Sequence, residues 1–342
     1  MSFKQRLHNW INGQWYGRPG LFLWMLFPLT WLYRVISVVG YKRALLSATS
    51  RLPVPVIVVG NISVGGTGKT PLVLYLIEQL TQRGLKVGVV SRGYGGHAEA
   101  YPQAVGQQTS AAIVGDEPQM IWEKAGCPVF VAPKRRLAAQ ALVDSCAVDL
   151  IICDDGLQHR ALPRDYEICV VDGSRGLGNG WLLPLGPLRE PANRLESVNF
   201  IVQNGNSRTG CELPEDLPPK AIMTLVADNL SGVGLKQGQT LALNALAGKT
   251  VHAFAGIGHP ERFFALLGQY AGSIVEHPRP DHYSYTNDDF VGFTLTDLVV
   301  MTEKDAVKCS ALGLVNAWAL PVKASLSVDL ADDICQHLGL SE

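Results

Sequence analysis

The chain has 342 residues, which is enough for a large buried core and for two domains. Its formal net charge is −1, so no overall positive charge attracts nucleic acid, and we expect no nucleic-acid partner. The 7 cysteines include no C-x-x-C pair, which argues against a disulfide scaffold or a zinc cluster and favours a reducing compartment.

The first expected element is an apolar N-terminal segment, residues 20–40, in which Arg34 is the only charge. A cleaved signal peptide does not fit, because no small-residue cleavage site follows the apolar run. A transmembrane helix fits by length, although Pro28 and Arg34 interrupt it, and a core helix packed on its own domain is a further alternative. We favour a helix lying at or partly in the membrane interface, because several tryptophans and basic residues accompany it.

A glycine-rich loop then follows the apolar run 54–59, which predicts a strand, and precedes residues 71–80, which predict a helix. Its residues are Ser63, Val64, Gly65, Gly66, Thr67, Gly68, Lys69 and Thr70. In this context backbone N–H groups surround a phosphate, Lys69 can reach the β- and γ-phosphates, and the Thr70 hydroxyl can bind Mg²⁺. Ser63 replaces the first glycine of the usual pattern. Because strand and helix flank the loop correctly, we interpret it as a nucleotide site rather than a simple turn.

Alternating strands and helices continue along the chain, which predicts a doubly wound parallel sheet of the α/β class. We expect helices at 118–126 and 135–145 and strands at 86–91, 128–132, 148–153, 167–171 and 199–203. Residues 205–219 are rich in Gly, Asn, Ser and Pro, as a boundary is. The segments 251–258, 260–269 and 298–301 then predict a second α/β unit.

Three parts are therefore expected. Residues 1–45 form the membrane-associating segment, residues 46–204 form a domain like those of P-loop nucleotide-binding proteins, and residues 205–342 form a smaller domain that closes the cleft. The last helix of the smaller domain could pack back on the first domain.

Asp154 and Asp155 end an apolar strand, as the Mg²⁺-binding carboxylate of nucleotide-binding proteins does. Such aspartates can also simply cap a helix. With the phosphate loop upstream, we assign a magnesium role to at least one of them. Gln158 and His159 follow within four residues and so lie near the site, where His159 is either a substrate-binding residue or a structural histidine.

Two further acidic loops are ambiguous. Asp116 opens a helix, where it could be a favourable first-turn charge, a general base or a metal-linked group. His282 lies between Asp281 and Tyr283 in what is by default a capped turn. A carboxylate hydrogen-bonded to this histidine would be a competent proton acceptor for a sugar hydroxyl.

Candidate substrate-binding residues lie in glycine-rich loops. Arg92 and Tyr94 follow the predicted strand 86–91, and ligands bind at the carboxyl ends of such strands. Arg189 lies in the loop 185–191, and guanidinium groups bind phosphate in a bidentate manner.

The segment T-E-K-D, residues 302–305, is superficially similar to the guanine-reading motif [NT]-K-x-D. Glu303 separates Thr302 from Lys304, so the spacing is wrong. This weakens a GTPase interpretation.

Taken together, the motifs resemble one family, the tetraacyldisaccharide 4′-kinases of lipid A synthesis. The matching segments are S-V-G-G-T-G-K-T (63–70), S-R-G-Y-G (91–95), G-D-E-P (115–118), D-D-G-L-Q-H (154–159), G-P-L-R-E-P (186–191) and T-E-K-D-A-V-K (302–308). They run in order across most of the chain and are specific as a set. On this resemblance Ser63 is a family trait, and the N-terminal segment is similar to the family's membrane-associating helix.

The resemblance implies that ATP and Mg²⁺ are cofactors and that the ATP γ-phosphate passes to the 4′-hydroxyl of tetraacyldisaccharide 1-phosphate, giving lipid IVA. By position in the motifs, Asp116 would be the base and His282 would assist it. Asp154 and Asp155 would serve the metal, and Lys69, with Thr70, the phosphates. The partners would be a lipid A disaccharide precursor and the cytoplasmic surface of the bacterial inner membrane.

Other function classes stay open. A membrane-associated ATPase or GTPase switch would hydrolyse nucleotide in response to a partner protein, but the motif set argues against it. A soluble kinase or ligase for a metabolite leaves the tryptophan-rich N-terminus unexplained. A purely binding function conflicts with two metal-competent carboxylates beside the loop.

Overall fold

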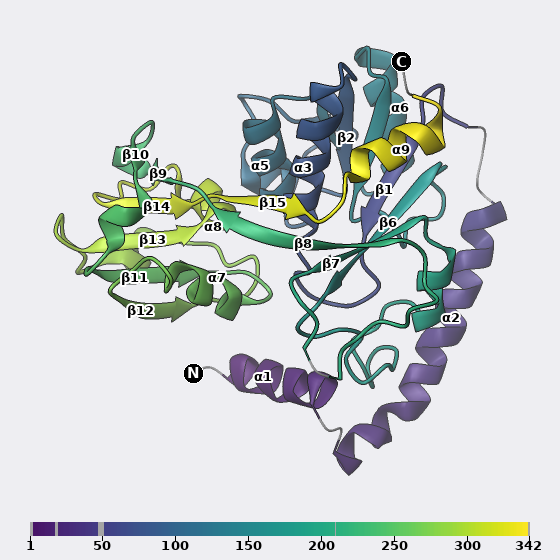
Figure 1. Ribbon diagram of the computed structural model, residues 1–342, viewed down its shortest axis with the longest axis horizontal. Coiled ribbons are helices and arrows are strands. Elements are labelled where there is room, and N and C mark those ends of the chain that lie inside the picture. The colour runs from purple at the N-terminus through teal and green to yellow at the C-terminus, as the bar shows by residue number, and fades with distance from the viewer. Residues whose placement is uncertain (1–2, 18–19, 47–50, 209, 341–342) are drawn as a thin grey trace.

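The computed structural model describes residues 3–17, 20–46, 51–208 and 210–340. Two β-sheets lie side by side, each with helices packed on it, and an N-terminal helical segment lies along the outside of the larger unit (Figure 1). This α/β architecture confirms the fold class expected from the alternating pattern.

The larger sheet has nine strands, which are mostly parallel. They are β1 (Val56–Gly60), β2 (Val87–Ser91), β3 (Gln103–Ala104), β4 (Val129–Val131), β5 (Leu150–Asp154), β6 (Tyr166–Asp172), β7 (Phe200–Asn204), β8 (Lys220–Ala227) and β15 (Val322–Leu326). Their order is β15-β8-β7-β6-β1-β5-β2-β4-β3. Strand β1 pairs in parallel with both β5 and β6, so the loops after these three strands meet at one edge of the sheet.

Helices cover both faces of this sheet. They are α3 (Lys69–Gln82), α4 (Ala111–Val114), α5 (Asp116–Ala125), α6 (Arg135–Ser145) and α9 (Leu330–Leu338). Ile57 and Val59 of β1 are buried in the layer that contains α3, α5 and α9, whereas Val56 and Val58 are buried in the layer with α6. A strand buried on both faces reads as a continuous apolar run, as residues 54–59 do.

The smaller sheet has six strands in the order β10-β9-β14-β13-β11-β12. They are β9 (Leu230–Val233), β10 (Thr240–Leu241), β11 (Thr250–Ala255), β12 (Ser273–Pro278), β13 (Leu298–Thr302) and β14 (Ala317–Leu320). Helix α7 (Pro260–Leu267) packs in one apolar layer and α8 (Glu303–Cys309) in the other. The strand expected at 251–258 ends at Ala255, because residues 256–259 form a loop that points toward the larger unit.

Strands β8 and β15 run side by side from the larger sheet toward the smaller one (Figure 1). They pair antiparallel, although about a hundred residues of sequence lie between them. Helix α9 follows β15, and its Leu330 and Ile334 lie in the core of the larger unit. The division of the chain at residue 204 stays a prediction. Strands β8 and β15 come after residue 204 in the sequence, yet both belong to the larger sheet.

The remaining short elements are 3-10 turns. They are η1 (Leu21–Leu26), η2 (Ala192–Ser197), η3 (Gly234–Lys236), η4 (Leu243–Leu246) and η5 (Asn287–Phe290).

The N-terminal segment comprises α1 (Phe3–Tyr16), η1 and α2 (Phe27–Leu46). Pro28 is the second residue of α2, in the first turn, where a proline is tolerated, so it does not interrupt this helix as we expected from the sequence. Residues 23–43 are long and apolar enough to cross a membrane, and only 11% of the most apolar window is buried against the protein. The helix touches the larger unit through Thr30 and Tyr33, which bond to Leu185 N and Arg189 O.

Candidate active site

The phosphate-binding loop connects β1 to α3 as the sequence predicts. Gly65 and Gly68 have φ values of 109° and 92°, in the region where glycine is favoured. A Cβ at Gly68 would overlap the amide of Asn204, which donates from Nδ2 to Thr67 O at 2.9 Å. Helix α3 starts at Lys69 without a side-chain cap, so its first N–H groups face the loop. A helix N-terminus of this kind binds phosphate.

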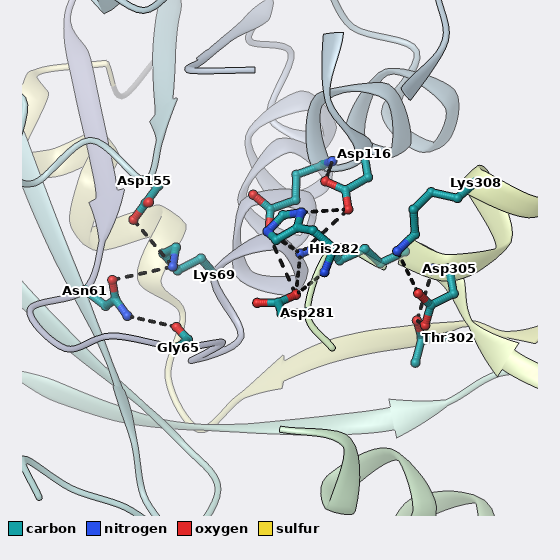
Figure 2. A network of polar contacts seen from close by, with 12 residues as sticks. Asn61, Gly65, Lys69, Asp116, Asp155, Asp281, His282, Thr302, Asp305 and Lys308 are labelled. Atoms are coloured by element: carbon teal, nitrogen blue, oxygen red, sulfur yellow. Dashed lines mark hydrogen bonds and ion pairs between the residues drawn. The ribbon is translucent and has the colours of Figure 1, made fainter. Parts of the chain in front are cut away.

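Lys69 lies between the loop and the end of β5. Its Nζ is 3.4 Å from Asp155 Oδ1 and 3.5 Å from Asn61 Oδ1 (Figure 2). Arg189 Nη1 lies 3.5 Å from the other oxygen of Asp155. Burial alone would raise the pKa of Asp155, but the charges of Lys69 and Arg189 hold that pKa below its ordinary value. Asp155 is therefore an ionised carboxylate at the mouth of the phosphate loop.

Asp154 is the most deeply buried carboxylate of this edge. Asp154 is only 1% exposed, and neither of its carboxylate oxygens has a hydrogen-bond partner. Burial first, and then the charges of Glu117 and Asp155, raise the pKa of Asp154 to about 7. A buried pair of oxygens without a donor is costly unless a ligand fills the site. The two adjacent carboxylates thus fit a hard divalent cation.

No group of three or more His, Cys, Asp or Glu side chains in the described part of the chain forms a complete metal cage. Mg²⁺ commonly uses one or two carboxylates and takes its other oxygens from water and substrate phosphates. Asp154 and Asp155 match that mode, and Thr70 is the second residue of α3, directly after Lys69, which contacts Asp155.

Asp116 and His282 form the second centre of the site, although they come from different sheets. Asp116 is 5% exposed at the start of α5, and its Oδ2 lies 3.1 Å from His282 Nδ1 (Figure 2). Its Oδ1 accepts a hydrogen bond from Glu117 N at 3.0 Å. Although burial opposes the charge, the contacts with His282 and Lys304 lower the pKa of Asp116. The hydrogen bond to Asp116 in turn raises the pKa of His282, against the effect of burial.

Close glycine packing fixes where Asp116 lies. A Cβ at Gly115 would lie 2.6 Å from Tyr94 O, and one at Gly96 would lie 2.5 Å from Gly115 N. The loop after β2 therefore packs directly on the backbone that precedes α5. The Tyr94 ring, on the same loop, lies 4.8 Å from the His282 ring between centroids.

Strain also marks the two centres. Among the described residues, Asp155 and His282 alone have a positive φ without being glycine, with values of 49° and 58°. Such conformations cost about 1–3 kcal/mol and gather at functional sites.

The smaller unit contacts the phosphate loop directly. A Cβ at Gly258 would lie 2.7 Å from Gly66 N, so the loop after β11 rests on the phosphate loop. Arg262 of α7 also donates to Asp172 Oδ1 at 2.6 Å, at the end of β6. The two sheets therefore approach each other over the site.

The structure brings most of the expected residues together at this edge. Arg189 reaches Asp155, and Tyr94 reaches His282. Arg92 is exposed on the loop after β2, and its charge is among the causes that lower the pKa of His159. His159 Nε2 accepts a hydrogen bond from Arg135 N at 3.2 Å, at the start of α6. Burial is the largest of the causes that lower the pKa of His159 to about 4. The ring is therefore neutral, which fits the alternative that His159 is a structural histidine.

Sequence reasoning gave no role to three side chains of the site. Asn61 contacts Lys69, Gln158 Nε2 donates to Asn61 O at 2.9 Å, and Lys304 lies beside His282. Lys304 belongs to the T-E-K-D segment, which we compared only with the guanine-reading motif. Its place directly after a predicted strand could have marked Lys304 as a candidate site residue.

Comparisons with known proteins agree with this geometry. The family model described as Tetraacyldisaccharide-1-P 4'-kinase matches residues 22–339. The chain is 45% identical over 328 residues to a tetraacyldisaccharide 4'-kinase of Hahella chejuensis, covering 93% of both chains. It is 45% identical over 341 residues to the enzyme of the same name from Methylobacillus flagellatus, covering 98% of this chain and 97% of that one.

A solved structure is similar over nearly the whole chain. It is LpxK from Aquifex aeolicus, in the "apo" form in complex with ATP, with a TM-score of 0.73 and 27% sequence identity. The similarity covers 93% of this chain and 100% of that chain. Together the matches confirm the fold, the kinase class and the place in lipid A synthesis that the motif set indicates. The chain belongs to the tetraacyldisaccharide-1-P 4′-kinase family.

Proposed function

We propose that the protein transfers the γ-phosphate of ATP to the 4′-hydroxyl of tetraacyldisaccharide 1-phosphate, giving lipid IVA, with Asp116 as the base. The observation that carries this assignment is the 3.1 Å contact between Asp116 Oδ2 and His282 Nδ1 beside the phosphate loop. A carboxylate that is ionised, buried and held by a histidine can accept the proton of a sugar hydroxyl.

The nucleotide would occupy the loop of residues 63–70. Backbone N–H groups of the loop and of the first turn of α3 would surround the β- and γ-phosphates. Lys69, now 3.4 Å from Asp155, would turn to the transferred phosphate and stabilise the charge that spreads over its oxygens.

Asp154, Asp155 and the Thr70 hydroxyl would hold Mg²⁺. When bound, the cation neutralises charge on the phosphate oxygens during transfer. Asp154 supports this assignment because both of its buried oxygens lack a partner. Asp155 would keep its contact with Arg189 on one oxygen and face the metal with the other.

The reaction needs a proton acceptor and close positioning. The 4′-oxygen attacks the γ-phosphorus, its proton passes to Asp116, and the bond to the β-phosphate oxygen breaks to release ADP. His282 donates to Asp116 Oδ2 and holds that carboxylate in place. The loop of residues 256–259 rests on the phosphate loop, so the unit around the smaller sheet, β9 to β14, would close the cleft on the unit around the larger sheet and exclude water.

The acceptor is a lipid, and the N-terminal segment, residues 1–45, would bring it to the site at the cytoplasmic face of the inner membrane. Helix α2 leaves large apolar side chains uncovered, with Trp31 63% and Ile36 62% exposed. A hollow of about 360 Å³ lies between α2 and the loop that precedes η2, lined in part by Trp31, Arg34 and Trp181. Apolar rings beside an arginine suit an acylated, phosphorylated ligand.

The phosphate groups of the acceptor would meet arginine and tyrosine side chains around the mouth. Arg189 lies in the loop that Tyr33 of α2 holds by its backbone, and Arg92 and Tyr94 lie in the loop after β2, where Tyr94 packs on His282. The 4′-hydroxyl would then lie near Asp116, which neighbours Tyr94 through His282.

Incubation with γ-³²P-ATP, Mg²⁺ and detergent-dispersed tetraacyldisaccharide 1-phosphate tests the proposal. We expect label in a new lipid that co-migrates with lipid IVA, and no such lipid with Lys69→Ala. Label released only as inorganic phosphate would overturn the proposal and favour a nucleotide-hydrolysing switch.

A further inference from the structure

The Lys304 side chain lies where the two units meet, beside Asp116, the proposed catalytic base. It is the second residue of α8, and its side chain is 15% exposed. Its Nζ lies 3.1 Å from Glu117 Oε1, 3.3 Å from Asp281 Oδ1 and 3.3 Å from His282 Nε2. Asp116 Oδ2 is 3.8 Å away. Glu117 and Asp116 belong to α5 of the larger unit, whereas Asp281 and His282 belong to the smaller one.

The ammonium group determines which nitrogen of His282 carries the proton. A protonated lysine has three donors and no acceptor, and here it has three acceptors within 3.3 Å. Burial opposes its charge, but the carboxylates of Glu117, Asp281 and Asp116 raise the pKa of Lys304, so it stays protonated. His282 Nε2 must then accept. In the neutral ring the proton therefore lies on Nδ1, which donates to Asp116.

Both nitrogens and one face of the His282 ring are in contact with neighbouring side chains. Asp116 contacts Nδ1, Lys304 contacts Nε2, and Tyr94 packs on the ring. Asp281 Oδ1 accepts from His282 N at 3.0 Å on the same loop. The charged groups that face the ring are thus Asp116 from α5, Asp281 from its own loop and Lys304 from α8. Glu117 acts through its contact with Lys304, and Lys308 acts on Asp116 one turn later.

We propose that Lys304 is a positioning residue for the phosphoryl transfer, which selects the Nδ1–H tautomer of the neutral His282 ring and orients Asp116 at the junction of the two units. The proposal rests on the proposed function, because it assigns His282 and Asp116 to the base. Lys304 touches neither ATP nor the acceptor hydroxyl in this scheme. It acts through His282, since its positive charge opposes a second proton on the ring.

A neighbouring ion pair provides a matched control. Lys124 of α5 pairs with Glu303 of α8, so it also joins the two units, but it contacts neither Asp116 nor His282. If Lys304 only held the units together, Lys124→Met and Lys304→Met would have the same kind of effect. If Lys304 sets the state of His282, only Lys304→Met changes the pH dependence.

The experiment compares full-length wild type, Lys304→Met, Lys304→Arg and Lys124→Met in the labelled-lipid assay between pH 5.5 and pH 9. Removing the cation lets His282 take a second proton more readily, and it also removes a charge that keeps Asp116 ionised. In the pH profile of kcat/KM, we therefore expect the acid limb, where activity falls at low pH, to move about one pH unit upward in Lys304→Met. We expect kcat to fall about 100-fold, with KM for ATP little changed.

Lys304→Arg keeps the charge but not the geometry, so the acid limb should stay near that of wild type while kcat stays reduced. Lys124→Met should leave the acid limb in place. An unchanged limb in Lys304→Met, or an equal shift in Lys124→Met, would overturn the proposal.

A direct reading of the ring does not depend on any lysine variant folding. Long-range ¹H–¹⁵N spectra of the wild-type protein, with the His282 signal assigned by His282→Asn, should show protonation at Nδ1 above the acid limb. An Nε2–H ring would refute the inference. These outcomes are separate from the proposed function, which fails only if wild type labels no lipid or Asp116→Asn retains transfer.

Discussion

Asp116 and His282 are 166 positions apart in the sequence, yet Asp116 Oδ2 and His282 Nδ1 lie 3.1 Å apart across the junction of the two sheets. Neither side chain alone would be an unusual feature of its loop. Their contact exists because residues 281–282 of the smaller unit reach the start of α5. The proposed base is therefore assembled by the approach of the two units.

Asp116→Asn tests the base directly. The amide cannot accept a proton from the hydroxyl but keeps the size of the side chain, and the phosphate loop is untouched. We expect transfer to lipid to fall about 10²–10⁴-fold while ATP affinity stays within a factor of two or so. Labelled-lipid formation and calorimetric ATP binding measure the two quantities. Transfer at the wild-type rate would exclude Asp116 as the base.

Gly115→Ala tests whether packing of the glycine loops positions Asp116. Its φ is 92°, and a Cβ there would lie 2.6 Å from Tyr94 O, which is backbone and cannot move freely. We expect Gly115→Ala to reduce transfer at least about 10-fold through displacement of Asp116.

The opposite end of the same helix supplies the control. Gly126 also has a positive φ, 62°, but a Cβ there meets nothing within 4 Å. Gly126→Ala should therefore cost about 1 kcal/mol of stability without a change in kcat. Equal kinetic losses in the two variants would show that backbone strain, rather than the contact with Tyr94, explains the effect.

The sequence predicts the positions of individual strands and helices more closely than it predicts the site. Strands β1 and β5 and helix α6 lie within about two residues of the expected spans, because buried strands and amphipathic helices leave a local apolar pattern. Pro28 was interpreted wrongly as an interruption, since a proline is equally compatible with a first helical turn.

The parts of the site that follow one strand were predictable, and the parts that join two units were not. Asp154 and Asp155 follow β5, so their place beside the phosphate loop is a local consequence of a parallel sheet. The proposed role of Lys304 depends on contacts with Glu117 and His282 that only the packed structure shows. His159 was ambiguous for the same reason, because its partner is the backbone of Arg135.

Asp154→Asn should stabilise the protein in the absence of divalent cations. Burial raises the pKa of Asp154 from its ordinary 3.8 to about 7, so ionisation is disfavoured in the folded state. The unfolded chain releases this proton first, and stability is lost as pH rises from about 4 to about 7. At pH 8 in EDTA we expect the melting temperature of Asp154→Asn to rise by at least about 2 °C. Mg²⁺-dependent transfer should be lost at the same time.

Asp155→Asn should have the opposite sign under the same conditions. Its pKa is held low by Lys69 and Arg189, despite burial, so the ionised form stabilises the fold above its ordinary pKa and this contribution is lost as pH falls. At pH 8 the variant leaves both cations without that carboxylate, and its melting temperature should fall. A lower melting temperature for Asp154→Asn as well would contradict the view that Asp154 is an unsatisfied buried charge.

Trp31→Asp combined with Ile36→Asp tests whether α2 is the membrane contact. Both side chains are more than 60% exposed, at 63% and 62%, so the changes remove apolar surface without disturbing the protein core. An aspartate costs about 2.5–3.5 kcal/mol at the centre of a membrane helix, so we expect the variant to leave phosphatidylethanolamine–phosphatidylglycerol vesicles in a flotation assay. Leu137→Asp on α6, where the leucine is 48% exposed, is the control and should still float. Retained flotation of the double variant would place the membrane contact elsewhere, whereas loss with both variants would indicate a general effect of added charge.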